Sequence, residues 1–446
     1  MYNFYELREK HPRFVYQGFS LTENSLEFDF RMDEHFFRPR WEFSADFSDI
    51  DRGLLNELAF SLGMAELVSY WKCACSPIVE IRCGSLDEKQ ILFWKTLCFN
   101  GLAEFFYRNG IETSFEDFMA IEAASSSQKK FTVPDLSGAL VPVGGGKDSV
   151  VTLEILKALS EDITPYIINA RGATLGCVKA AQISDPSEDK AVCPKRTIDK
   201  HLLELNAEGY LNGHTPFSAV VAFSSLLFAV ISRKKYIALS NESSSNETYV
   251  DGAEINHQYS KSTAFERDFR EYCRYSFGEF GDIPEYFSLL RPLSEWQIAR
   301  EFVKYPEYFG VFQSCNLGSK TNVWCCNCAK CLYVYILLAA FLDDETLVKI
   351  FGCNMLEKSE LFTMLDGLML DGEDKPFECV GTKDEVRLSL KMALDRRRDN
   401  TPVLLKRFEE KFPNYTPVRL DDYFDRENFV PEKFLSYLEK LINGYK

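Results

Sequence analysis

The chain has 446 residues, of which 46% are hydrophobic and 26% are charged. This composition is ordinary for a globular protein and excludes a mainly disordered, collagen-like or fibrous chain. With 51 Lys and Arg against 67 Asp and Glu, the formal net charge is −16. The chain therefore lacks the broad positive surface that nucleic acids and anionic membranes require, and we expect neither as a partner. A small anionic substrate stays compatible with a local basic pocket.

Neither a secretory leader nor a membrane-spanning segment is predicted. Residues 1–19 are charged and aromatic, and the most apolar run, 217–231, is too short to cross a bilayer. Without a leader, the 14 cysteines indicate metal chemistry in a reducing compartment rather than disulfides. We therefore expect a cytoplasmic protein.

Residues 1–130 are predicted to form an N-terminal α+β domain. The alternating segment 25–30 (Ser-Leu-Glu-Phe-Asp-Phe) is typical of a half-buried strand, and apolar helical patterns follow around 56–70 and 89–108. The polar run 125–130 predicts a linker.

Residues 131–345 alternate short apolar strands with helices, which predicts an α/β domain built on a parallel, doubly wound sheet. Thr215 and Pro216 are predicted as the N-cap and first residue of the helix expected at 217–232. The expected strands are 140–143, 165–169 and 235–240, and the expected helices are 150–159, 217–232 and 333–342. The remaining residues, 346–446, are charged and predicted to be mainly helical.

A glycine-rich loop, Gly-Gly-Gly-Lys-Asp-Ser, lies between the first of these strands and its helix, at residues 144–149. Gly144, Gly145 and Gly146 let backbone amides approach a phosphate closely at a helix start. Lys147 adds positive charge, Ser149 adds a hydroxyl, and Asp148 is a candidate Mg²⁺ ligand. The spacing fits neither the Walker A nor the Rossmann pattern. We predict a nucleotide site here. The alternative is a tight turn whose glycines serve only close packing.

Four cysteines, Cys315, Cys325, Cys328 and Cys331, have the spacing C-x9-C-x2-C-x2-C, with Cys326 as an extra thiol. This spacing predicts a closed Cys₄ site for a structural Zn²⁺ ion, because four thiolates leave no open coordination position. An iron–sulfur cluster and a set of buried free thiols are the alternatives.

Four polar runs follow predicted strands or precede a predicted helix, where an α/β sheet places its ligand crevice. They span residues 169–171, 212–216, 241–247 and 256–262. Each run alone has ordinary loop composition, but together with the glycine loop they predict one convergent polar site. From these runs we assign Asn169 to the nucleotide. The candidate substrate ligands are Arg171, Asn241, Asn246, His257 and Lys261.

The runs also contain candidates for proton transfer. His214 is the first candidate base because histidine titrates near neutrality, with His257, Lys261 and Cys379 as weaker alternatives. Glu242 is a further catalytic candidate, and either Glu242 or Glu247 is a candidate to share Mg²⁺ with Asp148. His11, His35 and His201 lie outside these runs and are predicted to be surface or structural residues.

The glycine loop resembles the PP-loop of ATP pyrophosphatases, with Gly144 in place of a leading serine, so that one phosphate-facing hydroxyl is absent. The cysteine cluster resembles the zinc knuckle of 7-cyano-7-deazaguanine synthase, itself a PP-loop enzyme. With the polar runs and segment 375–382 (Lys-Pro-Phe-Glu-Cys-Val-Gly-Thr), the chain resembles the MurL family. Members of that family are UDP-N-acetyl-α-D-muramoyl-L-alanyl-L-glutamate epimerases of peptidoglycan synthesis.

This resemblance implies an ATP- and Mg²⁺-dependent inversion of the substrate's terminal L-glutamate to D-glutamate, with AMP and pyrophosphate as by-products. Adenylating the carboxylate makes the neighbouring α-proton easier to remove, after which a base and a proton donor complete the inversion. The alternatives are a PP-loop ligase like 7-cyano-7-deazaguanine synthase, a tRNA-thiolating enzyme, and a nucleotide-binding sensor without turnover. The sequence leaves the oligomeric state open.

Overall fold

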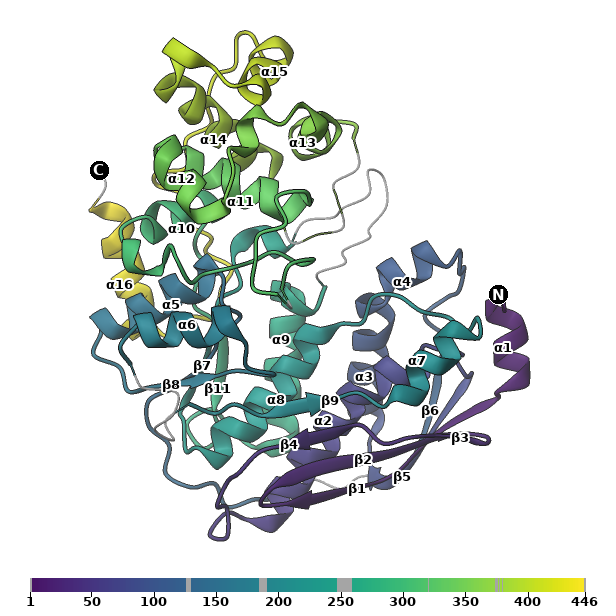
Figure 1. Ribbon diagram of the computed structural model, residues 1–446. Coiled ribbons are helices and arrows are strands. Elements are labelled where there is room, and N and C mark those ends of the chain that lie inside the picture. Colours follow the sequence, from purple (N-terminus) through teal and green to yellow (C-terminus); the bar gives the residue numbers. More distant parts are fainter. Residues whose placement is uncertain are drawn as a thin grey trace. The chain divides into compact units, whose positions relative to one another are not determined.

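The computed structural model describes residues 2–125, 130–183, 191–246, 259–319, 321–373, 376, 378 and 380–444. It is a mixed α/β structure with two sheets and many helices (Figure 1). The chain forms two compact units, each built from separate stretches of sequence. The first comprises Met1–Leu140, Val192–Ile237 and Ile255–Tyr286, and the second Val141–Ala191, Ala238–Glu254 and Phe287–Lys446. The division along the sequence into 1–130, 131–345 and 346–446 stays a prediction.

The first unit is built on a seven-stranded sheet with the order β6-β5-β1-β2-β4-β9, in which β3 also pairs with β2. The β1 strand is antiparallel to β2 and parallel to β5. Leu26, Phe28 and Phe30 of β2 are fully buried, which explains why the alternating pattern at 25–30 forms a strand. The strands are β1 (Arg13–Thr22), β2 (Ser25–Met32), β3 (His35–Phe37), β4 (Arg40–Glu42), β5 (Ile78–Ser85), β6 (Ala120–Ala124) and β9 (Lys195–Thr197).

A long apolar helix, α2 (Arg52–Trp71), packs on this sheet, and α8 (Phe217–Ile231) packs on α2 (Figure 1). The single helical pattern at 89–108 forms two helices that meet at Leu102. The α8 helix has Pro216 as its N-cap residue, so the prediction of Thr215 as the cap was wrong; the Thr215 hydroxyl instead accepts a hydrogen bond from Lys72. The other helices of the unit are α1 (Phe4–Lys10), α3 (Glu88–Gly101), α4 (Ala103–Arg108), α7 (Lys200–Ala207) and α9 (Thr263–Phe277).

A second, four-stranded sheet has the order β11-β10-β7-β8. It comprises β7 (Ala139–Pro142), β8 (Ile163–Tyr166), β10 (Tyr236–Leu239) and β11 (Glu285–Ser288). The β10 and β7 strands are parallel. The Glu285 N–H donates to the Lys235 carbonyl and the Leu289 N–H to the Leu239 carbonyl. Because residue numbers rise together along the two strands, β11 is parallel to β10. The strands predicted at 140–143 and 235–240 are confirmed, and the one predicted at 165–169 begins earlier, at Ile163.

The order of this sheet places β7 between β8 and β10, although β8 is the next strand along the chain. The chain therefore passes from β7 to β8 on one side of β7, and later adds β10 on the other side of β7. In α/β sheets a ligand crevice is expected at such a reversal, here at the carboxyl ends of β7 and β10.

The helices of the second unit surround α11 (Ala329–Ala339), every residue of which is buried. This explains its apolar sequence on all sides. The helical character predicted for 346–446 is confirmed. The other helices are α5 (Lys147–Ala158), α6 (Gly172–Ala180), α10 (Glu295–Phe302), α12 (Asp344–Phe351), α13 (Phe362–Met369), α14 (Lys383–Arg396), α15 (Val403–Lys411) and α16 (Glu432–Asn443). Among the helices described, none combines the length and apolar character needed to span a membrane.

Candidate active site

The glycine loop follows β7 and leads directly into α5. Gly145 has a φ of +86°, and a Cβ there would lie 3.0 Å from the backbone of Ala173 and Thr174. Glycine is thus required at this position both by the backbone conformation and by the approach of α6. In the described part of the chain, no side chain caps the start of α5, where Gly146 is the N-cap residue. The first N–H groups of α5 are therefore available to an anion.

The structure brings the glycine loop and residues 241–246 to the same edge of the four-stranded sheet. The loop follows β7 and these residues follow β10, the two strands that flank the reversal in strand order. The Thr152 hydroxyl of α5 donates to the Ser240 hydroxyl at 2.9 Å, and the Asn241 amide donates to Ser288 at 3.0 Å. Polar side chains thus connect α5, the end of β10 and the end of β11 at this edge of the sheet.

Lys147 is buried and pairs with two carboxylates, those of Asp148 and Glu295. Burial opposes the charged ammonium, but the two carboxylates outweigh burial and raise the pKa of Lys147. Burial, together with the negative charges of Asp148 and Glu242, raises the pKa of Glu295. Asp148 is the accessible member of the group, with 24% of its side chain exposed. Asp148 is thus the more accessible carboxylate of the group, and Lys147 is bound to the protein's own carboxylates.

The sequence did not indicate two of the carboxylates at this site, that of Glu295, which pairs with Lys147, and that of Glu385, which bonds to the Glu295 backbone. Glu295 is the first residue of α10, and its backbone N–H donates to the Glu385 carboxylate at 2.7 Å. The other oxygen of Glu385 accepts from the Thr382 N–H at 2.7 Å. Capping boxes at 294–297 and 382–385 were the available signals. They predict helix starts, but they do not indicate contact with a loop some 150 residues earlier.

Glu242 is buried directly after β10. Its backbone carbonyl accepts a 2.6 Å hydrogen bond from the fully buried Arg291, and its carboxylate accepts one from Ser244 at 3.3 Å. After burial and the charge of Asp148, Glu242 contributes to the raised pKa of Glu295. Its catalytic and Mg²⁺-sharing roles stay predictions.

The remaining predicted ligands occupy different surroundings. Asn169 follows β8 with a φ of +54° and is exposed. Arg171 is exposed at the start of α6, where its backbone N–H donates to the Thr174 hydroxyl at 3.0 Å. Asn246 is exposed at the end of a 3₁₀ helix, Ser243–Asn246, and Lys261 ends another, Tyr259–Lys261, in the first unit. His257, Glu247 and Cys379 lie outside the described residues.

His214 belongs to the first unit, in the loop that leads into α8. Its Nδ1 lies 3.4 Å from the Glu104 carboxylate. The buried Lys72 holds this loop, because its ammonium donates to the His214 carbonyl at 3.2 Å and to Thr215 at 2.7 Å. Burial lowers the pKa of Lys72 to about 8. A carboxylate beside a histidine orients the imidazole ring, and the role of His214 as a base stays a prediction.

The four predicted metal ligands lie together, with their sulfur atoms within 4.8 Å of one another. The Cys331 N–H donates to the Cys328 sulfur, and that of Cys325 to Cys315, each at 3.4 Å. Hydrogen bonding from the Cys331 thiol lowers the pKa of Cys328 to about 5. The extra thiol, Cys326, donates instead to the Phe351 carbonyl at 3.1 Å. Four converging sulfurs, one favoured as thiolate, fit a tetrahedral zinc ion.

A second cluster of titratable side chains lies in the first unit. His11 is buried, with Nδ1 2.7 Å from the Asp33 carboxylate and Nε2 2.9 Å from the Tyr210 hydroxyl. His35 Nδ1 lies 2.9 Å from His201 Nε2. The three histidines thus join the end of α1, the β2–β3 turn and α7, which agrees with the structural role predicted for them.

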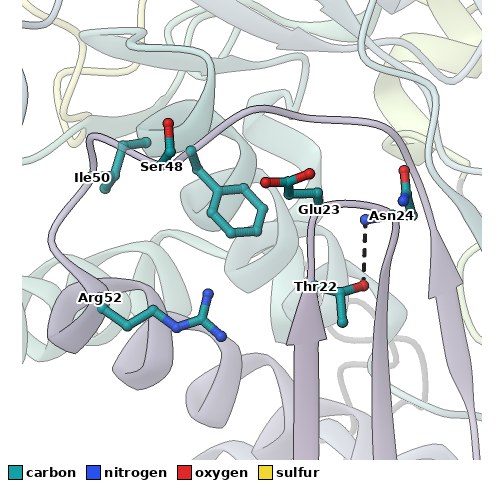
Figure 2. A pocket seen from close by; sticks show the side chains of 7 residues that line it. Thr22, Glu23, Asn24, Ser48, Ile50 and Arg52 are labelled. Carbon is teal, nitrogen blue, oxygen red and sulfur yellow. Dashed lines mark hydrogen bonds between the residues drawn. The ribbon is translucent and has the colours of Figure 1, made fainter.

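Figure 2 shows a shallow hollow of the first unit, beside the β1–β2 turn, that contains none of the predicted site residues. The Asn24 N–H donates to the Thr22 hydroxyl at 3.4 Å, and Arg52 donates to the Leu21 carbonyl at 2.8 Å. These polar groups bond to the turn and its own strand, and we assign no ligand to the hollow.

Comparison with known proteins supplies the class of the chain. Family models of the MurL N-terminal domain and the MurL C-terminal domain match residues 6–289 and 311–422. The chain is similar to proteins named UDP-N-acetyl-alpha-D-muramoyl-L-alanyl-L-glutamate epimerase. The one from Xanthomonas oryzae pv. oryzae is 34% identical over 76% of this chain and 75% of its own length. The one from Micromonospora sp. is 34% identical over 79% of this chain and 78% of its own length. The one from Salinispora tropica is 32% identical over 73% of this chain and 70% of its own length.

Epimerases are isomerases, so these matches identify the chain as an enzyme of the isomerase class. Both family models and all three relatives agree, and the chain belongs to the MurL family.

Proposed function

We propose that the chain inverts the terminal L-glutamate of UDP-N-acetylmuramoyl-L-alanyl-L-glutamate to D-glutamate in peptidoglycan synthesis, using ATP and Mg²⁺. The observation that carries the proposal is the name shared by three relatives that match over 70% or more of their own lengths. Their activity transfers to this chain because the similarity covers both family domains.

The glycine loop supports an adenylation step in a PP-loop-like, doubly wound domain. In this step a carboxylate oxygen of the terminal glutamate attacks the α-phosphorus of ATP, and the bond to the β-phosphate oxygen breaks to release pyrophosphate. The uncapped amides of α5, beyond Gly145 and Gly146, are suited to hold the phosphates. Water later cleaves the acyl-adenylate, which releases AMP and restores the carboxylate.

Asp148 is the group proposed to hold Mg²⁺, because its carboxylate is partly exposed at the loop while its partner Lys147 is buried. Carboxylate oxygen is the ligand that Mg²⁺ prefers, and the bound ion neutralises phosphate charge. The four clustered cysteines are proposed to hold a structural Zn²⁺ ion, which closes the segment between Cys315 and Cys331.

Inversion requires removal of the α-proton on one face and its return on the other. His214 is the proposed base, because Glu104 orients its imidazole and Lys72 anchors its backbone. Arg171, Asn241, Asn246, His257 and Lys261 stay proposed substrate ligands, and Asn169 a proposed nucleotide ligand. The group that returns the proton is left unassigned.

The test is incubation with ATP, Mg²⁺ and UDP-N-acetylmuramoyl-L-alanyl-L-glutamate, followed by chiral analysis of the glutamate. We expect D-glutamate together with AMP and pyrophosphate, formed only when the muramoyl dipeptide is present. Adenylation of another acceptor without inversion would favour a PP-loop ligase, and nucleotide binding without turnover would favour a sensor.

A further inference from the structure

The segment that precedes the cysteine cluster lies against the glycine loop. The Gln313 backbone N–H donates to the Gly145 carbonyl at 2.7 Å. The Ser314 hydroxyl oxygen lies 2.6 Å from the position that a Cβ on Gly146 would occupy. Residues 313 and 314 therefore form a wall along the glycine loop, at Gly145 and Gly146. Because Ser314 directly precedes Cys315, the cysteine cluster fixes one end of this wall.

Both side chains of the wall retain hydrogen-bonding capacity. Gln313 is more than nine-tenths buried, yet its amide nitrogen has no partner among the residues that the structure describes. Ser314 is half-buried, and its hydroxyl makes no hydrogen bond within the same part of the chain. Buried polar groups in proteins are nearly always hydrogen-bonded, so the unused Gln313 donor, in a segment whose backbone contacts the glycine loop, is available to a ligand.

The loop itself lacks one phosphate-facing hydroxyl, at Gly144, where the PP-loop pattern begins with serine. Nothing in the fold requires glycine there. Gly144 is not among the residues with positive φ, and a Cβ would meet only the Ser149 hydroxyl, at an ordinary 3.8 Å. Gly145 and Gly146 differ, because a Cβ would lie 3.0 Å from backbone at Gly145 and 2.6 Å from Ser314 at Gly146.

We propose that Ser314 supplies to the nucleotide phosphates the hydroxyl contact that Gly144 does not make, while Gln313 holds the segment against the loop. This inference rests on the proposed nucleotide site at the glycine loop. A hydroxyl beside uncapped helix amides donates a charge-assisted hydrogen bond to a phosphate oxygen. Ser314 binds the phosphates and takes no part in bond making or breaking.

The test is calorimetric titration of the full chain with the Mg²⁺ complex of α,β-methylene-ATP, which cannot be cleaved between its α and β phosphates. Ser314→Ala should weaken binding about 10- to 100-fold, the loss expected for one hydrogen bond to a charged group. Adding Gly144→Ser to this variant should bring affinity back to within about threefold of the wild type, because the hydroxyl returns from the other side of the loop. Ser319→Ala is the matched control, since the Ser319 hydroxyl donates to the Asn316 carbonyl at 3.0 Å. It should leave affinity unchanged.

The outcomes separate this inference from the proposed function. Failure of the wild type to bind the analogue would overturn the nucleotide site and the role of Ser314 together. Wild-type binding with equal affinity in Ser314→Ala would overturn the role of Ser314 alone. Loss of affinity without rescue by Gly144→Ser would show that Ser314 acts through packing, which also overturns the inference.

A second measurement checks the underlying geometry without any nucleotide. Gly146→Ala should lower the melting temperature slightly in the wild-type background, because its new Cβ would lie 2.6 Å from the Ser314 hydroxyl, which must rotate away. In the Ser314→Ala background the nearest remaining atom is the residue 314 Cβ, at 3.8 Å, and the penalty should largely disappear. Equal penalties in the two backgrounds would contradict the placement of Ser314 on the loop and overturn the proposal.

Discussion

The glycine-loop site of the second unit and the histidine cluster of the first unit both gather titratable side chains from distant parts of the sequence. In the histidine cluster, both nitrogens of His11 contact protein groups, and His35 contacts His201. At the glycine loop, by contrast, the start of α5 has no side-chain cap and Gln313 keeps an unused amide donor, as far as the described residues show. A cluster whose polar atoms hydrogen-bond to one another stabilises the fold. Donors left over at a glycine-lined helix start indicate a ligand.

The largest expected effect tests the loop side of this comparison. Asp148→Ala removes the accessible carboxylate proposed for Mg²⁺, so formation of AMP with the muramoyl dipeptide should fall about 10³-fold or more. The matched control is Asp33→Ala, which removes the carboxylate that contacts His11. It should leave AMP formation unchanged. Normal pyrophosphate release by Asp148→Ala would refute the assignment of the loop.

His214→Ala tests whether a residue of the first unit takes part in the chemistry. Loss of the base should slow inversion by about 10²- to 10⁴-fold while AMP formation that depends on the substrate continues. Solvent deuterium should enter the α-position in the wild type and much more slowly in the variant. His201→Ala, from the histidine cluster, is the control and should invert normally. Normal inversion by His214→Ala would move the search to Lys261 and Cys379.

The cysteine cluster gives a smaller effect, on stability. Purified protein should hold about one zinc ion per chain, and Cys328→Ser should release it and lower the melting temperature by about 5–15 °C. Cys326→Ser is the matched control because that thiol donates to Phe351 rather than joining the cluster. Elemental analysis showing neither zinc nor iron would refute the metal site.

The smallest expected effect belongs to His35. Burial lowers the pKa of His35 in the folded chain, so below its ordinary value of about 6.5 the unfolded chain binds this proton more readily. Stability from neutral His35 is therefore present above about pH 6.5 and is lost as the pH falls toward the lowered pKa. His11, His201 and Glu34 face the same ring, so comparison with His35→Gln isolates its contribution.

Between pH 7 and 5 the wild type should lose about 1–3 °C more in melting temperature than His35→Gln. Equal losses would show that protonation of His35 is not coupled to unfolding. Turnover at pH 7 should be the same in both proteins, because the histidine cluster contains no proposed site residue.

Sequence patterns predicted local structure well and long-range contacts poorly. The strands at 140–143 and 235–240 formed as predicted, because continuous apolar runs bounded by loop residues suit a buried parallel sheet. The helix start at Thr215 was wrong because a tertiary partner, Lys72, binds its hydroxyl. The sequence did not predict that the chain returns to the first sheet as β9. A strand of three residues is too short to show an alternating pattern of apolar and polar residues.

The sequence by itself determined the glycine loop and the cysteine spacing. Each lies within a short stretch of chain, where backbone geometry fixes which residues are neighbours. Only the tertiary structure decided that Glu295 pairs with Lys147 and that Ser314 lies against Gly146. Contacts across some 150 residues depend on strand order and helix packing. No local sequence pattern predicts such contacts. The glycine loop could therefore be identified from the sequence, whereas the residues that pack around it could not.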